Sequence, residues 1–166
     1  MNLLKYKECV DALNQTHLIH LKDLVLAAPQ VIILGNGGSN AISSHIAQDY
    51  SKKLNTPTLS FDGSARMSCY ANDFGWENAY IGFLKDFAKK DTLVILISSS
   101  GESKNILNCA SYCKENGIQM VTMSGFNPSN SLRHHWKPVS ALHFYVNSDD
   151  YGIVECIHEL ILHSII

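Results

Sequence analysis

Short unbroken apolar runs alternate along this chain with longer stretches in which apolar residues recur at helical spacing. The short runs predict buried strands, the second of which is the weakest: 31–34, 58–61, 92–97, 119–123 and 142–146. The longer stretches predict helices over residues 3–28, 40–54, 65–71, 76–89, 104–116 and 151–165. We expect loops over 72–75 and 125–138, and a break in the first helical stretch near Asn14 to Thr16, where Thr16 could cap a second helix.

Strands that are apolar on both faces and alternate with helices are typical of a parallel sheet covered on both sides. The sequence therefore predicts an α/β fold, a three-layer α/β/α sandwich around a central, mostly parallel sheet. The length of 166 residues suits a single domain. Within it we distinguish an N-terminal helical region, residues 1–28, from an α/β core over residues 29–166.

The first predicted strand opens into a helix through glycines, in the sequence VIILGNGGSN from Val31 to Asn40. Glycines let backbone N–H groups approach a ligand, and a helix N-terminus favours negative charge, so this turn is a candidate anion cradle. Asn40 stands where a Rossmann fingerprint needs its third glycine, and the turn lacks the Gly-Lys-Ser/Thr of a P-loop. A tight turn without a ligand is the alternative.

The third strand ends in a second turn of this kind, with the sequence SSSGES over residues 98–103. Hydroxyls and backbone N–H groups at a helix N-terminus can hold a phosphate dianion without Lys or Arg. The alternative is a serine-rich loop that only caps the following helix. Both turns would lie at the carboxyl edge of the sheet, where open α/β sheets bind ligands.

Two helices carry side chains suited to metal binding or acid–base chemistry. His45 and Asp49 lie four residues apart on the helix after the first turn, and therefore on one face of it. An ordinary hydrogen-bonded pair is the alternative. The last helix offers several pairs that spacing cannot rank: Glu155 with His163, Glu159 with His163, and Glu155 with His158.

Composition narrows the class of protein. Hydrophobic residues make up 46% of the chain and the net charge is −2 without a basic run, so nothing supports nucleic-acid binding. The five cysteines form no CxxC pair, which indicates reduced thiols, and Cys109 and Cys113 are expected to be packing residues. The N-terminus lacks a signal-peptide core, and no stretch reaches the ~20 apolar residues of a membrane span. We therefore expect a cytoplasmic protein that does not bind membranes.

Five segments occur together in order: GNGGS, then His45-x-x-x-Asp49, then NDFG at 72–75, then SSSGES, then a last helix with Glu155 and His163. This series resembles the sugar isomerase (SIS) domain family, and within it the phosphoheptose (sedoheptulose 7-phosphate) isomerases. The resemblance runs from about Ala28 to the end of the chain. It implies the SIS fold, which is flavodoxin-like.

The resemblance also implies roles for individual residues. Substrate would be contacted by Asn36, Gly37, Gly38 and Ser39 in the first turn, by Asn72 and Asp73 at the sugar hydroxyls, and by Glu155. Phosphate would be bound by Ser98, Ser99, Ser100 and Ser103. A Zn²⁺ ion would be held by His45, Asp49, Glu155 and His163, and the catalytic residues would be Asp49 and His163.

Two positions depart from the family pattern. Asp49 stands where the family usually has its catalytic glutamate, and Glu155 stands where it usually has a ligand glutamine. The aspartate is one methylene shorter, which moves its carboxylate by about 1 Å or more, a displacement that matters for proton transfer. Both residues still offer oxygen ligands, so a zinc site with two histidines and two carboxylates is chemically sound.

The activity implied by the resemblance is an aldose–ketose isomerisation. It would convert sedoheptulose 7-phosphate to D-glycero-D-manno-heptose 7-phosphate through an enediolate, with help from the metal and without a redox or nucleotide cofactor. A homotetramer with active sites at subunit interfaces is also implied, although the N-terminal helical region is shorter than usual. The alternatives are an isomerase of another sugar phosphate, a non-catalytic SIS protein that binds a partner such as the replication initiator, and a regulatory sugar-phosphate sensor.

Overall fold

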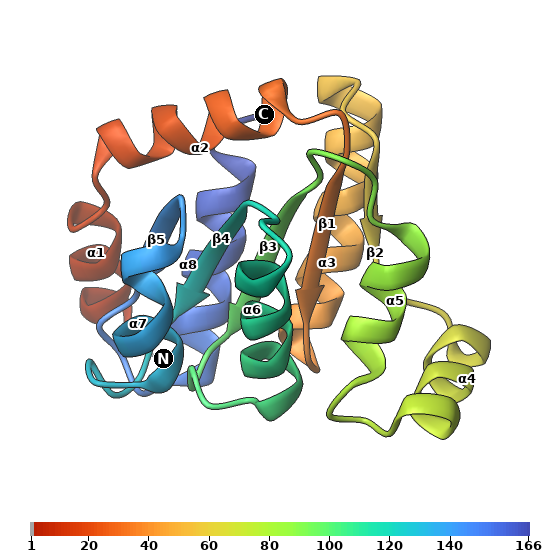
Figure 1. Ribbon diagram of the computed structural model, residues 1–166. Coiled ribbons are helices and arrows are strands. Elements are labelled where there is room, and N and C mark those ends of the chain that lie inside the picture. The colour runs from red at the N-terminus through yellow and green to blue at the C-terminus, as the bar shows by residue number, and fades with distance from the viewer. Residues whose placement is uncertain (1) are drawn as a thin grey trace.

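The computed structural model describes residues 2–166, and the strands of this part of the chain form a five-stranded sheet (Figure 1). The strands are β1 (Val31–Gly35), β2 (Thr58–Ser60), β3 (Leu93–Ser98), β4 (Met120–Ser124) and β5 (Leu142–Tyr145). They lie in the order β2-β1-β3-β4-β5, and every neighbouring pair is parallel. Helices cover both faces of the sheet, so the predicted three-layer α/β/α sandwich is confirmed.

The helices divide between the two faces. One face carries α1 (Leu3–Asp11), α2 (Gln15–Ala27), α3 (Gly38–Asp49), a π-helical continuation of α3 (Tyr50–Leu54) and α8 (Tyr151–His163). The other face carries α5 (Ala79–Phe87), α6 (Lys104–Glu115) and α7 (Ser131–Trp136), which a short 3-10 turn (Lys137–Val139) follows. Helix α4 (Ser64–Phe74) packs against α5.

Successive strand residues point into two separate hydrophobic cores. In β1, Val31 and Ile33 join the core under α3 and α8, whereas Ile32 and Leu34 join the core under α5 and α6. All four side chains are fully buried. Because both faces of the strand are covered, β1 is continuously apolar in sequence instead of alternating.

The strand order brings the two candidate turns together. β1 pairs with β3 in a register that sets Gly35 opposite Ile97, so both strands end at the same edge. From that edge the chain enters α3 after β1 and α6 after β3. In open α/β sheets, ligands bind where the helices that follow two neighbouring strands lie on opposite faces of the sheet. The predicted meeting of the two turns at the carboxyl edge is confirmed.

The predicted cap of the second helix is wrong. The cap is Asn14 instead of Thr16, because the Asn14 side chain accepts hydrogen bonds from the backbone N–H groups of Thr16 at 2.8 Å and His17 at 3.3 Å. Asparagine is among the strongest N-cap residues, since its short side chain reaches the free N–H groups of the first turn.

The loop predicted over residues 72–75 is also wrong. Helix α4 continues to Phe74 and ends at Gly75, which has φ of +72°. The Phe74 ring stacks on Tyr70 with centroids 5.8 Å apart and covers Gly82, where a Cβ would clash with it. This packing stabilises a last helical turn whose own residues, Asn and Asp, are poor helix formers.

Helix α7 lies within the stretch 125–138 that the sequence predicts as a loop. Asn130 caps it by accepting a hydrogen bond from the backbone N–H of Arg133 at 2.9 Å, and Leu132 is fully buried beneath it. A helix of six residues is stabilised by such packing and not by its own propensity. Turn-forming residues on both sides conceal it in the sequence.

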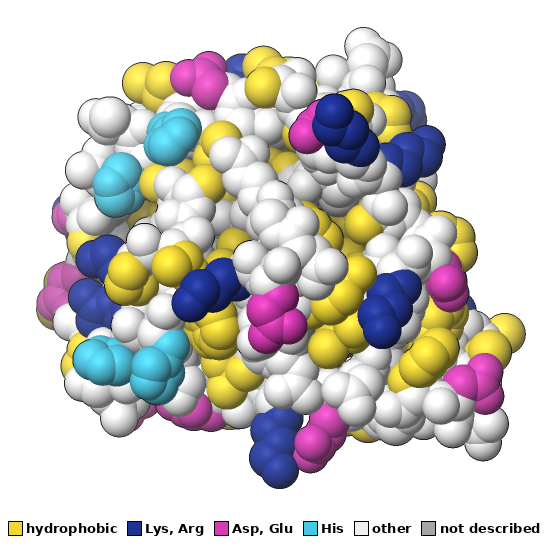
Figure 2. Space-filling view, viewed as in Figure 1, with side chains coloured by type: hydrophobic (Ala, Val, Ile, Leu, Met, Phe, Trp, Pro, Cys, Tyr) yellow, Lys and Arg dark blue, Asp and Glu magenta, His cyan; other side chains and the backbone are white. Residues whose placement is uncertain are grey.

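The surface agrees with the low charge of the chain. Figure 2 shows the face covered by α5, α6 and α7, where Lys and Arg are spread among Asp and Glu instead of forming one patch. This distribution is consistent with the net charge of −2. Within residues 2–166, none of the helices has the length and apolar character needed to cross a membrane.

Candidate active site

The two turns enclose a pocket of about 210 Å³ at the carboxyl edge of the sheet. The residues that line it include Asn36, Gly37, Gly38, Ser39, Ser98, Ser99, Ser100 and Ser103 from the turns, and Tyr151 and Glu155 from α8. The structure thus brings together the substrate-binding residues predicted in both turns and Glu155, which is also predicted to contact substrate. Their individual roles stay predictions.

The first turn requires glycine at two positions. A Cβ on Gly35 would lie 2.8 Å from the backbone carbonyl of Ser39, so glycine lets the chain fold back tightly into α3. Gly37 precedes α3 with φ of +54° and ψ of −122°, a conformation that other residues rarely adopt. The result is a helix N-terminus that borders the pocket, where the helix dipole favours an anion.

An amide pair joins the first turn to α6. The Asn36 Nδ2 donates to Asn105 Oδ1 at 2.9 Å, and the Asn105 Nδ2 donates to Asn36 Oδ1 at 2.8 Å. The Tyr80 hydroxyl lies 2.5 Å from the carbonyl oxygen of Gly35, and burial raises the pKa of this phenol, so it stays protonated and donates. The turn is therefore held rigidly beside the helix that follows the serine turn.

One hydroxyl of the serine turn is buried without a hydrogen-bond partner in the described part of the chain. Ser98 Oγ donates to Ser103 Oγ at 3.1 Å and accepts from the backbone N–H of Gly101 at 3.1 Å. Ser99 is 5% exposed, and its Oγ has no hydrogen-bond partner within residues 2–166. Leaving a buried hydroxyl unpaired costs about 1–3 kcal/mol, so this oxygen is available to a polar ligand.

Helix α8 closes the pocket with two side chains. The N-cap residue of α8 is Asp150, so Tyr151 is the first helical residue, and it lies at the rim of the pocket. The Tyr151 ring packs edge-on against the Phe126 ring, with ring centroids 4.6 Å apart. Glu155 reaches over the first turn so closely that a Cβ on Gly38 would overlap its carboxylate. Sequence reasoning missed Tyr151. The signal that could have found it is its position as the first helical residue after a capping aspartate.

A second group of side chains lies farther along α3 and α8. His45, Asp49 and His163 offer ligand atoms that all lie within 4.8 Å of one another. Asp49 Oδ2 lies 3.6 Å from His163 Nε2 and 4.0 Å from His45 Nε2. The side chain of Asp49 is 14% exposed and that of His45 is 53% exposed, so the cluster opens to the surface.

Lys53 also contacts Asp49, because its Nζ donates to Asp49 Oδ2 at 2.8 Å. This hydrogen bond is the main reason that the pKa of the Asp49 carboxyl lies below its usual value, and the charges of Lys53, His45 and His163 lower it further. Partial burial acts in the opposite direction but is outweighed. Asp49 is therefore ionised at neutral pH, as a base or a metal ligand must be.

The cluster fits a divalent metal ion. Two imidazole nitrogens and one carboxylate oxygen form a donor set that Zn²⁺ accepts, and the exposed side leaves a fourth position for water or substrate. Neither Glu155 nor Glu159 joins this group of residues. The pairs that spacing left open on the last helix are therefore not the ones that meet, since His163 meets His45 and Asp49 on α3.

Asn72 and Asp73 lie away from the pocket. Both are exposed on α4, which stands beyond α5 at the lower right of Figure 1. The Asn72 Nδ2 donates to Asp73 Oδ1 at 2.9 Å, and neither residue lines the pocket. The structure does not bring their side chains to the other predicted substrate-binding residues of the same subunit.

The pocket and the cluster are arranged along one helix. Gly38 lies at the pocket, and His45 and Asp49 follow seven and eleven residues later on α3. At about 1.5 Å per residue, this places the cluster roughly 10–16 Å along the helix from the anion cradle. A ligand bound at both places would need an anionic group at one end and a reacting group several atoms away.

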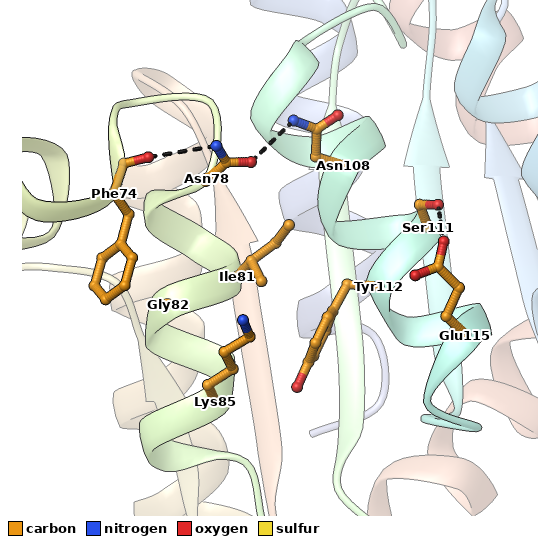
Figure 3. Close-up of a pocket in the computed structure, with 9 residues that line it drawn as sticks. All are labelled: Phe74, Asn78, Ile81, Gly82, Lys85, Asn108, Ser111, Tyr112 and Glu115. Atoms are coloured by element: carbon orange, nitrogen blue, oxygen red, sulfur yellow. Dashed lines mark hydrogen bonds between the residues drawn. The ribbon is translucent and has the colours of Figure 1, made fainter.

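A wider groove of about 510 Å³ lies elsewhere, between α5 and α6 (Figure 3). Ile81 and Lys85 line it from α5, and Tyr112 lines it from α6. Its lining contains neither of the two turns and no histidine. It lacks an anion cradle and any residue of the cluster of His45, Asp49 and His163, so the smaller pocket is the candidate site.

Known proteins share this fold and this type of sequence. A family model described as SIS domain matches residues 20–125. A phosphoheptose isomerase of Helicobacter pylori (strain P12) is 30% identical over 141 residues, which cover 81% of this chain and 70% of the relative. The structures of phosphoheptose isomerases from Neisseria gonorrhoeae and Francisella tularensis match with TM-scores of 0.85 and 0.84, at 16% and 20% identity. Both matches cover 99% of this chain, with 91% and 90% of the respective relative, and show a common fold.

Proposed function

Because this chain belongs to the SIS domain family, we propose that it is an aldose–ketose isomerase that converts sedoheptulose 7-phosphate to D-glycero-D-manno-heptose 7-phosphate. The observation that carries the proposal is the placement of an anion pocket and a His–Asp–His cluster along the same two helices. Relatives that are named phosphoheptose isomerase support the choice of substrate.

The phosphate of the substrate is proposed to bind in the pocket between the two turns. Backbone N–H groups at the start of α3 and the hydroxyls of the serine turn would donate hydrogen bonds that stabilise its charge without a cationic side chain. The sugar chain then extends along α3 toward Asp49. A heptose phosphate presents its groups in this order, because its carbonyl lies at the end of the carbon chain opposite the phosphate.

Asp49 is the proposed base. It removes a proton from C1 of the ketose, beside the carbonyl at C2, and the resulting enediolate receives a proton at C2 to give the aldose. His163, whose Nε2 lies 3.6 Å from Asp49 Oδ2, moves the accompanying proton between the oxygens on C1 and C2. The electron pair of the broken C–H bond stays within the substrate, so no redox partner is needed.

We propose that His45, Asp49 and His163 hold a Zn²⁺ ion, with water or a substrate oxygen in the fourth position. Glu155, the further ligand that the family resemblance implies, lies at the pocket instead. When bound, the metal would polarise the carbonyl and stabilise negative charge on the substrate oxygens. The two carboxylate oxygens of Asp49 allow one to serve as a ligand and the other as the base.

A homotetramer with active sites at subunit interfaces, located in the cytoplasm, completes the proposal. The cluster opens to the surface, and Asn72 and Asp73 are exposed and distant from the pocket of their own subunit. A neighbouring subunit would bring such residues to the site. The five free cysteines fit a reducing compartment. Light scattering on the purified protein tests the assembly, and a monomer would contradict it.

Turnover of sedoheptulose 7-phosphate tests the activity, with Asp49→Asn as the diagnostic variant. The amide keeps the size of the side chain but cannot accept a proton from carbon, so kcat should fall about 10²- to 10⁴-fold. The matched control is Asp23→Asn, which removes an exposed carboxylate from α2 and should leave kcat unchanged. Equal activity of the two variants would remove Asp49 from the mechanism.

Absence of turnover by the wild-type protein supplied with Zn²⁺ would overturn the proposal. A second candidate, an isomerase of another sugar phosphate, is favoured by Tyr151 and Glu155, which add a ring and a charge to the pocket. Assays of other ketose phosphates in parallel distinguish the two, since the faster substrate identifies the sugar. Elemental analysis of protein purified without chelator identifies the metal.

A further inference from the structure

Lys53 donates a hydrogen bond to Asp49 Oδ2, the carboxylate oxygen that a metal ion in the cluster would need as a ligand. Its Nζ lies 2.8 Å from Asp49 Oδ2, closer than His163 Nε2 at 3.6 Å or His45 Nε2 at 4.0 Å. The ammonium group is thus the nearest cation to the central ligand of the cluster.

The local fold holds Lys53 in this position. Residues 50–54 form a π-helical continuation of α3, on which Lys53 follows Asp49 by four residues. Tyr50 is fully buried in this segment, and its hydroxyl donates to the carbonyl oxygen of Leu162 at 2.9 Å. Since Leu162 directly precedes His163, one buried hydrogen bond aligns the lysine segment with the histidine end of α8.

We propose that Lys53 is a built-in competitor for the metal, which must displace its ammonium group from Asp49 before the three ligands can bind together. The proposal rests on the proposed function for the identity of the cluster as a metal site. It assigns Lys53 a positioning role, because the lysine acts on Asp49 and not on the substrate.

The charges and the exposure of the site support this competition. A lysine ammonium is a point charge on a flexible stem, and the Lys53 side chain is 51% exposed, so it can swing into water when a metal arrives. A divalent ion and an ammonium cannot share one carboxylate oxygen without strong repulsion. The displaced ion pair is a partly exposed one, so the penalty on metal affinity is modest.

Zn²⁺ affinity measured by competition with a chromophoric chelator tests the proposal, without any sugar present. Lys53→Met should bind Zn²⁺ about five- to tenfold more tightly than wild type, because the metal no longer breaks an ion pair. Lys52→Met is the matched control: Lys52 is exposed on the same segment and has no ion pair in the described part of the chain. It should shift the affinity by at most about twofold, through long-range charge alone. Lys53→Arg keeps the cation and should stay close to wild type.

Equal gains for Lys53→Met and Lys52→Met would overturn the proposal, because the effect would then be one of net charge. Unchanged or weaker binding by Lys53→Met would overturn it too, as would absence of Zn²⁺ binding by all four proteins. Thermal unfolding of the metal-free variants verifies that each is folded. Turnover of sedoheptulose 7-phosphate by the same samples separates the two proposals: no turnover with the expected affinities refutes only the isomerase, and turnover with equal affinities refutes only the competition.

Discussion

Glu155 places a negative charge where the phosphate is proposed to bind. Its carboxylate lies over Gly38 at the N-terminus of α3, in the region that the helix dipole makes favourable for an anion. A phosphate that enters the pocket meets this carboxylate at short range. The charge on this side chain therefore influences how strongly the pocket attracts the substrate.

Replacement of Glu155 by Gln should lower KM for a sugar phosphate by about three- to tenfold, because it removes a like charge that acts across a few ångströms of partly wet pocket. The amide keeps the size of the side chain and its oxygen. Steady-state kinetics at fixed metal concentration measure KM and kcat separately.

Glu159→Gln is the control for this prediction. Glu159 lies one turn farther along α8 and does not line the pocket, but its replacement changes the net charge equally. We expect its KM to match wild type. A rise in KM for Glu155→Gln would contradict the prediction and would make the carboxylate a favourable contact for substrate hydroxyls.

At the scale of residues, local pairs could be predicted and distant ones could not. The pairing of His45 with Asp49 follows from helical spacing alone. Their approach to His163 depends on how α3 packs against α8. Only the family resemblance indicated that these three residues form one site. Glu155 stays out of the cluster because eight residues separate it from His163, about 12 Å along a helix.

At the scale of elements, the two turns could be predicted because glycines and serines directly follow buried strands. The errors at residues 72–75 and in α7 have the opposite cause. Turn-forming residues lie within or beside both stretches, and helices form there because Phe74 packs on Gly82 of α5 and Leu132 is buried in the core under α6. Propensity describes neighbours in sequence and contains no information on such packing.

Gly35→Ala tests the element that organises the site. The added Cβ would lie 2.8 Å from the backbone of Ser39, and backbone cannot move aside without opening the turn between β1 and α3. We expect a loss of about 1–3 kcal/mol in the free energy of unfolding, as for other overpacked sites. Urea denaturation followed by circular dichroism measures it.

Gly117→Ala is the comparison for this variant. Gly117 has φ of +64°, and a Cβ there would meet nothing within 4 Å, so only backbone strain of about 1 kcal/mol is expected. A stability of Gly35→Ala equal to wild type would show that the turn can relax. Such a result would mean that the close approach of the Ser39 backbone is not what requires glycine at position 35.

At the scale of the whole molecule, the site depends on the strand order. The two turns lie side by side because β1 pairs with β3, while β2 adds to the outer side of β1. Apolar runs in the sequence indicate that strands exist, but strand pairing is decided by the two cores that the helices build on either face. The number of layers could therefore be predicted from the sequence, whereas the exact neighbours of each strand could not.

The same packing buries a histidine that makes the stability of the molecule depend on pH. His158 lies on α8 in the fully buried interior, with Nε2 3.3 Å from the carbonyl oxygen of Ser124. Loss of solvation lowers the pKa of this imidazole to about 4, below the value of about 6.5 expected in the unfolded chain. His143 shows the same direction, with a pKa of about 4 that results mainly from burial.

The unfolded chain therefore takes up protons that the folded protein excludes as the pH falls from 6.5 toward 4, and this uptake favours unfolding. Between pH 7 and pH 5, His158 should contribute a loss of about 2 kcal/mol in the free energy of unfolding. Urea denaturation at the two pH values measures the difference. His158→Gln cannot titrate and should reduce the pH dependence by that amount, whereas His20→Gln, at an exposed position of α2, should leave it intact. If both variants showed the same pH dependence, groups other than His158 would cause the acid sensitivity. The His158 imidazole would then be better solvated than the packing of α8 on β4 implies.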